Sequence, residues 1–331
     1  NGVMLDGRPA SLVHRDVSPE PTGREVLVCR DCAARLDAAG RQADADRAPN
    51  VSRRVSEWLS AAYPEYTFTF PDDFGQLADL GDETHLATIY IDGNRIGALF
   101  EAVARAGGKS KRELARGIDG ATRDGLVAGL TAILPTAEGP PAEGGTPQKV
   151  TVPAIAHLVG GDDVLLSVPA AAGWGFAEAF LEAFTESLAA WSRKSGLPLS
   201  GPAPSASAGL VVHHHKHPFA LIVDSAAETL SYAKSQMSGQ EGAVAWVDVS
   251  STGSQLHGPR AAAWLAENRS TLRALSKVKP AQRSRLGHTS DEDLRSQVNR
   301  MKVEPAQVLL REGGPLALED ALSIVRWWNH G

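Results

Sequence analysis

The feature that most constrains the fold is a tight acidic hairpin, Gly160-Gly161-Asp162-Asp163. It separates two apolar runs of strand length, Ala154–Val159 and Val164–Val168. Paired glycines between such runs favour a short turn, because glycine adopts the positive φ angles that tight hairpin turns require. Two adjacent carboxylates at the turn repel each other unless a positive charge lies nearby, and a divalent cation is the usual solution. The motif therefore predicts a strand pair with a metal-binding tip.

A second acidic position, Asp92, comes directly after the apolar run Leu86–Ile91. Apolar spacing around it predicts alternating strands and helices. Besides the two hairpin strands, the expected elements are a strand at 86–91, a helix at 94–106, a helix at 174–192, a strand at 206–213, a helix at 219–234 and a strand at 243–249. The first six elements have the β-α-β-β-α-β order of a ferredoxin-like α+β domain. That topology places the end of the first strand beside the central hairpin turn, so Asp92 should meet Asp162 and Asp163.

The remaining sequence predicts three regions. Residues 1–80 form a polar N-terminal region, with an amphipathic helix at 51–62 and an edge strand at 66–70. Residues 81–250 hold the α+β domain, including a further helix at 125–134 and a Gly/Pro/Glu-rich surface loop at 135–148. Residues 251–331 form a C-terminal helical domain whose last helix is expected at 316–328.

Composition excludes several classes of protein. The 331 residues are 43% hydrophobic and 22% charged, as in ordinary globular proteins. The net charge of −6 argues against a chain that binds nucleic acid through a generally basic surface. No apolar run is long enough to predict a membrane span. Only two cysteines occur, which argues against a secreted disulfide scaffold and favours the reducing cytoplasm.

The acidic positions fit metal-assisted phosphoryl transfer. Two divalent ions, Mg²⁺ or Mn²⁺, can activate an attacking hydroxyl and balance the charge of a triphosphate. Asp92, Asp162 and Asp163 are the expected ligands and catalytic residues, helped by a backbone carbonyl such as that of Gly93. Asn94 is placed to cap the following helix, whose free amides could hold phosphate oxygens. Lys234, at the end of a later helix, could reach the same triphosphate.

Several segments resemble one known family, the large subunit of type III CRISPR effector complexes. Asp92 and the hairpin lie in segments similar to its second palm domain, and a later strand and helix match in the same order. The matching segments are 91–97, 157–165, 207–219 and 226–234, within about half of the chain. The Gly-Gly-Asp-Asp tetrad alone is a weak signal, but ordered matches on the expected elements are a strong one.

The resemblance implies a palm related to diguanylate cyclases and polymerases, with ATP as substrate and a cyclic oligoadenylate or another cyclic nucleotide as product in antiviral defence. It implies that Gly93, Asn94, Gly160, Gly161 and Lys234 contact the nucleotide. It also implies other effector-complex subunits and RNA as partners. The family pairs two palms, and no clear palm precedes residue 86. A homodimer, or a further N-terminal half, would supply the second palm. No His-Asp nuclease domain is apparent.

Other interpretations stay open beside this one. A catalytically silent palm could serve as a nucleotide- or RNA-binding scaffold. A cyclase using GTP is disfavoured, because the hairpin continues Asp-Asp-Val rather than Glu-Phe. Cys29 and Cys32 could form half of a zinc ribbon completed by His14 or by upstream residues, or could be two reduced structural cysteines.

Three further features have simple structural explanations. The histidines at 213, 214, 215 and 217 are read as a strand end rather than as a metal site. Trp327-Trp328 is read as a packing anchor. The basic stretch 109–112 is read as a solvated face.

Overall fold

The structure is a computed structural model, and it divides into two compact units, Asn1–Glu57 and Trp58–Gly331. It describes residues 12–15, 25–28, 51–81, 84–106, 110–135, 147–195, 204–239, 241–250, 257–286 and 289–328. In the first unit, β1 (Leu12–Arg15) pairs antiparallel with β2 (Glu25–Val28). Helix α2 (Val51–Ala62) runs across the boundary between the units, at the position predicted from its amphipathic pattern. Cys29 and Cys32 lie outside the described residues.

A six-stranded sheet forms the centre of the second unit, in the order β10-β9-β8-β4-β7-β6. Its strands are β4 (His85–Gly93), β6 (Ile155–Gly160), β7 (Asp163–Pro169), β8 (Ala206–His214), β9 (Ala243–Asp248) and β10 (His257–Ala261). Strand β4 pairs antiparallel with both β7 and β8, and β9 joins β8 in parallel. The neighbours β8-β4-β7-β6 have the ferredoxin-like order, so the predicted α+β palm topology is confirmed.

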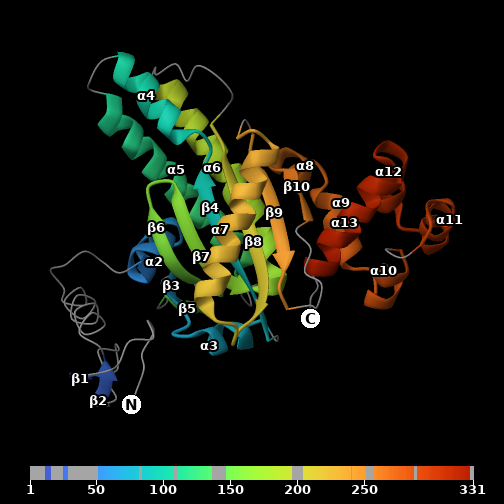
Figure 1. Ribbon diagram of the computed structural model, residues 1–331, viewed down its shortest axis with the longest axis horizontal. Coiled ribbons are helices and arrows are strands. Elements are labelled where there is room, and N and C mark those ends of the chain that lie inside the picture. The colour runs from blue at the N-terminus through green and yellow to red at the C-terminus, as the bar shows by residue number, and fades with distance from the viewer. Residues whose placement is uncertain are drawn as a thin grey trace. The chain divides into compact units, whose positions relative to one another are not determined.

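Helices cover both faces of this sheet (Figure 1). They are α4 (Ile96–Ala106), α5 (Ser110–Ile133), α6 (Gly173–Ser195) and α7 (Phe219–Gln236). Adjacent strand residues point to opposite faces. On β9, Ala245 packs with Ala233 of α7, whereas Trp246 contacts Trp174 of α6 with ring centroids 5.1 Å apart. The two helices therefore lie on opposite faces.

Helix α5 begins much earlier than expected, since only residues 125–134 were predicted to be helical. The N-terminal part of α5 is rich in charged residues, so the sequence shows no clear apolar pattern there. Leu114 and Ile118 are nevertheless buried. Helix α6 packs so closely on α5 that its aromatic rings occupy the space beside glycines. A Cβ at Gly129 would lie 2.7 Å from the Phe176 ring, and one at Gly117 would lie 2.4 Å from the Trp191 ring.

Two short elements, a strand and a helix, were not predicted. Strand β5 (Gln148–Thr151) pairs in parallel with β3 (Tyr66–Thr69), at the end of the predicted loop 135–148. Helix α3 (Phe74–Asp79) packs its Leu77 against Leu86 of β4. Residues 136–146 of the predicted loop lie outside the described part of the chain.

Helices follow β10 as far as Trp328, as predicted, although β10 itself was not expected. They are α8 (Ala262–Glu267), α9 (Arg269–Ser276), α10 (Pro280–Leu286), α11 (Asp291–Met301), α12 (Glu304–Glu312) and α13 (Gly314–Trp328). Arg269 joins α9 to α6 through Glu178 and Glu182, each at 2.5 Å. In the described part of the chain, no helix has both the length and the apolar character needed to cross a membrane.

A row of polar side chains crosses the α7 face of the sheet through four strands. His157 Nε2 is 2.9 Å from Ser167 Oγ, Ser167 Oγ is 2.8 Å from Thr88 Oγ1, and Thr88 Oγ1 is 2.8 Å from His213 Nε2. His213 Nδ1 lies 3.0 Å from the carbonyl oxygen of His214, so Nδ1 carries the proton and Nε2 accepts from Thr88. Burial lowers the pKa of both histidines to about 4.

Candidate active site

Strand β4 brings Asp92 to the edge of the sheet on the α7 side. Alternate residues of a strand share a face, and Tyr90 packs into the cluster formed with Ile222 and Ala226 of α7. Asp92, two residues further on, therefore points the same way. After Gly93 the chain turns sharply, with Arg95 at a φ of 57°, and α4 begins.

The acidic hairpin has the predicted tight turn. Gly160 pairs with Asp163, so the loop consists of Gly161 and Asp162 alone. Gly161 has a φ of +61° whereas Asp162 has a negative φ, a pattern that fits a type II′ turn. Thr122 of α5 holds this turn in place, since its Oγ1 donates a hydrogen bond of 2.6 Å to the carbonyl oxygen of Gly161.

The sheet register brings the two acidic segments together, as the topology predicted. Ile91 of β4 lies opposite Val164 of the antiparallel strand β7. The next residue of β4, Asp92, therefore lies beside Asp163, which precedes Val164. Asp162 reaches across to the same place: a Cβ on Gly93 would lie only 2.8 Å from Asp162 Oδ2. Glycine at position 93 is what allows the Asp162 carboxylate to approach β4 so closely.

Crowding raises the pKa values of the hairpin carboxyls. The pKa of Asp162 rises to about 6, first because of burial and then because the Asp92 carboxyl lies within hydrogen-bonding distance. The pKa of Asp163 is also raised, by burial and then by the charge of Asp92, although a hydrogen bond from Tyr90 partly offsets this. The site therefore favours a bound cation, because a cation relieves the repulsion among these groups.

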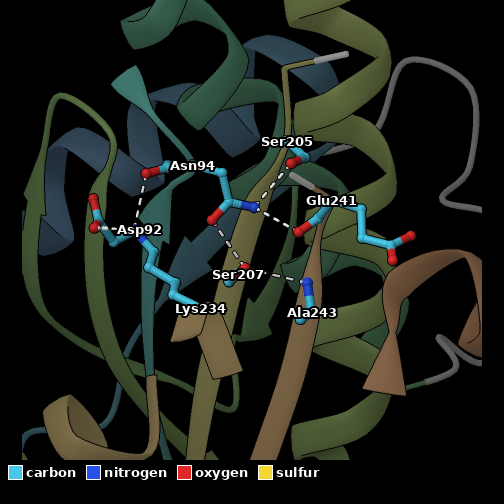
Figure 2. A network of polar contacts seen from close by, with 8 residues as sticks. Asp92, Asn94, Ser205, Ser207, Lys234, Glu241 and Ala243 are labelled. Atoms are coloured by element: carbon cyan, nitrogen blue, oxygen red, sulfur yellow. Dashed lines mark hydrogen bonds and ion pairs between the residues drawn. The ribbon is translucent and has the colours of Figure 1, made fainter. Parts of the chain in front are cut away.

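One cation is supplied by the protein itself. The Lys234 ammonium, from the last turn of α7, donates to Asp92 Oδ2 and, at 2.9 Å, to the carbonyl oxygen of Gly93 (Figure 2). The sequence predicted that Lys234 would reach this edge of the sheet, but as a partner for phosphate. Its contact with Asp92 was not foreseen, because 142 positions separate the two residues.

The comparison with protein families identifies this domain. Residues 85–242, which contain the hairpin, Asp92 and Lys234, match the family model described as Cas10/Cmr2, second palm domain. The chain contains a Cas10/Cmr2 second palm domain. The resemblance stated from the sequence segments is thereby confirmed. No curated protein sequence gives a significant match.

Solved structures similar to the chain are Csm1 proteins. A Csm1–Csm4 cassette in complex with cA3 is 16% identical, with a TM-score of 0.46, and the match covers 74% of this chain and 36% of that one. The same cassette with AMPPNP is 15% identical, with a TM-score of 0.40, covering 77% and 38%. Csm1 of T. onnurineus is 15% identical, with a TM-score of 0.41, covering 77% and 39%. The chain thus spans less than two fifths of these solved chains.

Asn94 of the Cas10/Cmr2 palm has a different position from the one predicted. It is 5% exposed, and its Nδ2 donates to Ser205 Oγ at 2.8 Å and to the carbonyl oxygen of Glu241 at 2.9 Å. Its Oδ1 accepts from Ser207 Oγ at 3.0 Å (Figure 2). Both side-chain donors are therefore used inside the fold rather than at the start of α4, so the expected cap is wrong, and the contact of Asn94 with nucleotide stays a prediction. Instead it ties the end of β4 to the starts of β8 and β9.

The outer side of the palm hairpin is open. Gly160 and Gly161 are both exposed, and a Cβ added to either would have no neighbour within 4 Å. A ligand therefore has room to approach the backbone of this turn, where the sequence predicted nucleotide contacts.

The donor atoms of the site are all oxygens. In the described part of the chain, no three His, Cys, Asp or Glu side chains are placed to hold one ion together. The acidic site therefore offers a close pair, Asp92 and Asp162, together with the Gly93 carbonyl and with Asp163 directly beside them. His213 and His214 are the last two residues of β8, at the strand end that the sequence predicted.

Proposed function

We propose that this Cas10/Cmr2 palm binds ATP with Mg²⁺ or Mn²⁺ and joins ATP units into a cyclic oligoadenylate that acts in antiviral defence. The observation that carries the proposal is the meeting of Asp92 with Asp162 and Asp163 at one edge of the palm sheet. Two hairpin carboxyls with raised pKa values, beside a third carboxylate at an open edge of the sheet, are costly for the fold, and such costs concentrate at functional sites.

The donor set fits a hard divalent ion. Mg²⁺ prefers carboxylate and carbonyl oxygens, and it is usually held by one or two carboxylates with the substrate phosphates completing the coordination. Asp92, Asp162 and the Gly93 carbonyl would hold it, with Asp163 available for a second ion. When bound, such ions activate a hydroxyl and balance the triphosphate charge.

The residues of the chain have distinct tasks in this scheme. Thr122 fixes the hairpin, so that Asp162 and Asp163 stay aimed at β4. Lys234 supplies a positive charge at the same edge, where it would contact phosphate. The first turn of α4 begins just after Asn94, and its backbone N–H groups have no partner within the helix, so they add favourable positive potential for a triphosphate.

We also propose the partners that the sequence suggested. The solved neighbours include Csm1–Csm4 cassettes, which supports other effector-complex subunits as partners of this chain. A second palm, from a homodimer or from another chain, would complete the paired arrangement. RNA is proposed as the activating ligand.

Incubation with radiolabelled ATP or GTP and Mn²⁺ tests the activity. The wild type should form a cyclic product from ATP, and more of it when RNA is added, whereas an Asp162→Ala/Asp163→Ala variant should form none. A matched control is Asp224→Ala/Glu228→Ala, which removes two exposed carboxylates from α7 and should keep activity. Product from the Asp162→Ala/Asp163→Ala variant would contradict the site assignment. Nucleotide binding by the wild type without any product would favour a scaffold.

A further inference from the structure

Lys234 contacts two oxygen atoms at the end of β4 that the proposed metal ion would also use. Its ammonium donates to Asp92 Oδ2 and to the carbonyl oxygen of Gly93. The contact is partly shielded from water, since the Lys234 side chain is 25% exposed and that of Asp92 is 32% exposed. The Lys234 charge also acts on Asp163, where it opposes the rise in the pKa of that carboxyl.

An ammonium and a divalent ion cannot both use these oxygens fully. Each would need Asp92 Oδ2 and the Gly93 carbonyl oxygen, and two cations a few ångströms apart repel each other strongly where water is partly excluded. Asp162 and Asp163 lie in the same site as Asp92, so the ion and the ammonium would be attracted by the same carboxylates.

We infer that Lys234 and a divalent ion compete for Asp92 and Gly93, so that binding of the ion releases the lysine ammonium. This inference rests on the proposed function, which places the ion at this site. Lysine carries its charge on a flexible stem with three donors, so the released ammonium becomes available to an anion that arrives with the ion. Metal and triphosphate binding are then coupled through one side chain, which favours a metal–nucleotide complex over free metal.

Chemical labelling tests the release directly. An amine-reactive reagent, with mass spectrometry of the digested chain, measures how fast Lys234 is modified with and without Mg²⁺. We expect Mg²⁺ to raise the rate at Lys234 about fivefold, the factor that corresponds to a partly exposed ion pair. The exposed Lys111 serves as an internal reference and should not change. Asp92→Asn should raise the Lys234 rate in the absence of Mg²⁺.

Metal affinity gives a second readout that does not depend on turnover. Free Mn²⁺, followed by electron paramagnetic resonance, reports binding to the wild type, to Lys234→Met and to Arg95→Met. Lys234→Met should bind Mn²⁺ about fivefold more tightly. Arg95→Met removes one positive charge from an exposed residue in the same turn and should change the affinity much less.

The outcomes separate the inference from the proposed function. Mn²⁺ binding with equal affinity in wild type and Lys234→Met, or Lys234 labelling that Mg²⁺ leaves unchanged or lowers, overturns the competition alone. Absence of Mn²⁺ binding in all three proteins overturns the metal site and the competition together. An equal gain in Arg95→Met and Lys234→Met also overturns the competition, because it would reflect overall charge.

Discussion

Thr122, in the middle of α5, donates a hydrogen bond of 2.6 Å to the carbonyl oxygen of Gly161, at the tip of the acidic hairpin. Thr122 is 1% exposed, and α5 is packed tightly on α6, so the donor is held rigidly. The hairpin is thus fixed at its tip as well as by its strand pairs. This contact connects the helical layer to the position of Asp162.

Replacing Thr122 with valine should loosen the hairpin with little loss of packing. We expect unfolding to become easier by about 1 kcal/mol, the usual value of one hydrogen bond, and Mn²⁺ affinity to fall several-fold. Urea unfolding and Mn²⁺ binding measure the two effects. Thr131→Val is the control, because its Oγ1 bonds only to Val127 of its own helix. Equal Mn²⁺ affinities in the two variants would contradict a positioning role for Thr122.

Asp162→Asn should stabilise the protein at neutral and alkaline pH. The folded-state pKa of Asp162 is raised to about 6 from 3.8, so the unfolded chain releases this proton more readily, and stability is lost as pH rises from about 4 to about 6. Because the group is only half-buried, we expect a gain of about 1 kcal/mol at pH 8, or about 3 °C in Tm. The gain should vanish near pH 4. Thermal unfolding across this range checks it, and a variant less stable than wild type at pH 8 would contradict the raised pKa.

Two glycine substitutions should differ sharply in their effect on stability. Gly160→Ala adds a Cβ that meets nothing within 4 Å, so stability should change by less than about 0.5 kcal/mol. If nucleotide approaches the hairpin backbone, ATP affinity should fall nonetheless. Gly209→Ala places a Cβ 2.4 Å from the backbone nitrogen of Leu230 and should destabilise the fold by about 3 kcal/mol or more, as overpacking against backbone does. Unchanged ATP affinity in Gly160→Ala would argue against a nucleotide contact there.

His213, in the row of polar side chains that crosses the sheet, should make the fold sensitive to acid. The pKa of His213 is lowered from 6.5 to about 4 by burial, so below pH 6.5 the unfolded chain takes up a proton that the folded chain refuses. Stability is therefore full above pH 6.5 and is lost as pH falls toward 4, at about 1 kcal/mol per pH unit for one histidine. His213→Gln should remove this part of the slope, whereas His217→Gln, a partly exposed control, should keep it. Identical slopes in the two variants would contradict the assignment.

Much of the fold could be predicted because its signals are local. The apolar runs and the Gly-Gly turn identify β4, β6, β7 and β8, and their order determines the sheet. The meeting of Asp92 with Asp162 then follows from topology. Short elements were missed: α3 has only six residues, and the four residues of β5 lack the aromatic and threonine alternation that identified β3.

The contacts that define the site depend on residues far apart in sequence. The partners Asn94 and Ser207 are 113 positions apart, and Thr122 and Gly161 are 39 apart. Asn94 was misjudged because a residue at the start of a helix is ordinarily a cap. Only the structure reveals that the Asn94 side chain forms hydrogen bonds with Ser205 and Ser207 instead.

The direction in which β4 presents its side chains restricts how this domain can evolve. Thr88 of the polar row and Asp92 of the acidic site share a face because an even number of steps separates them. Insertion or deletion of one residue between them would turn Asp92 toward the α6 side, out of reach of Lys234. Related sequences should therefore tolerate changes of side chain within this stretch far better than changes of length, and an alignment gap there would mark a palm that has lost the site.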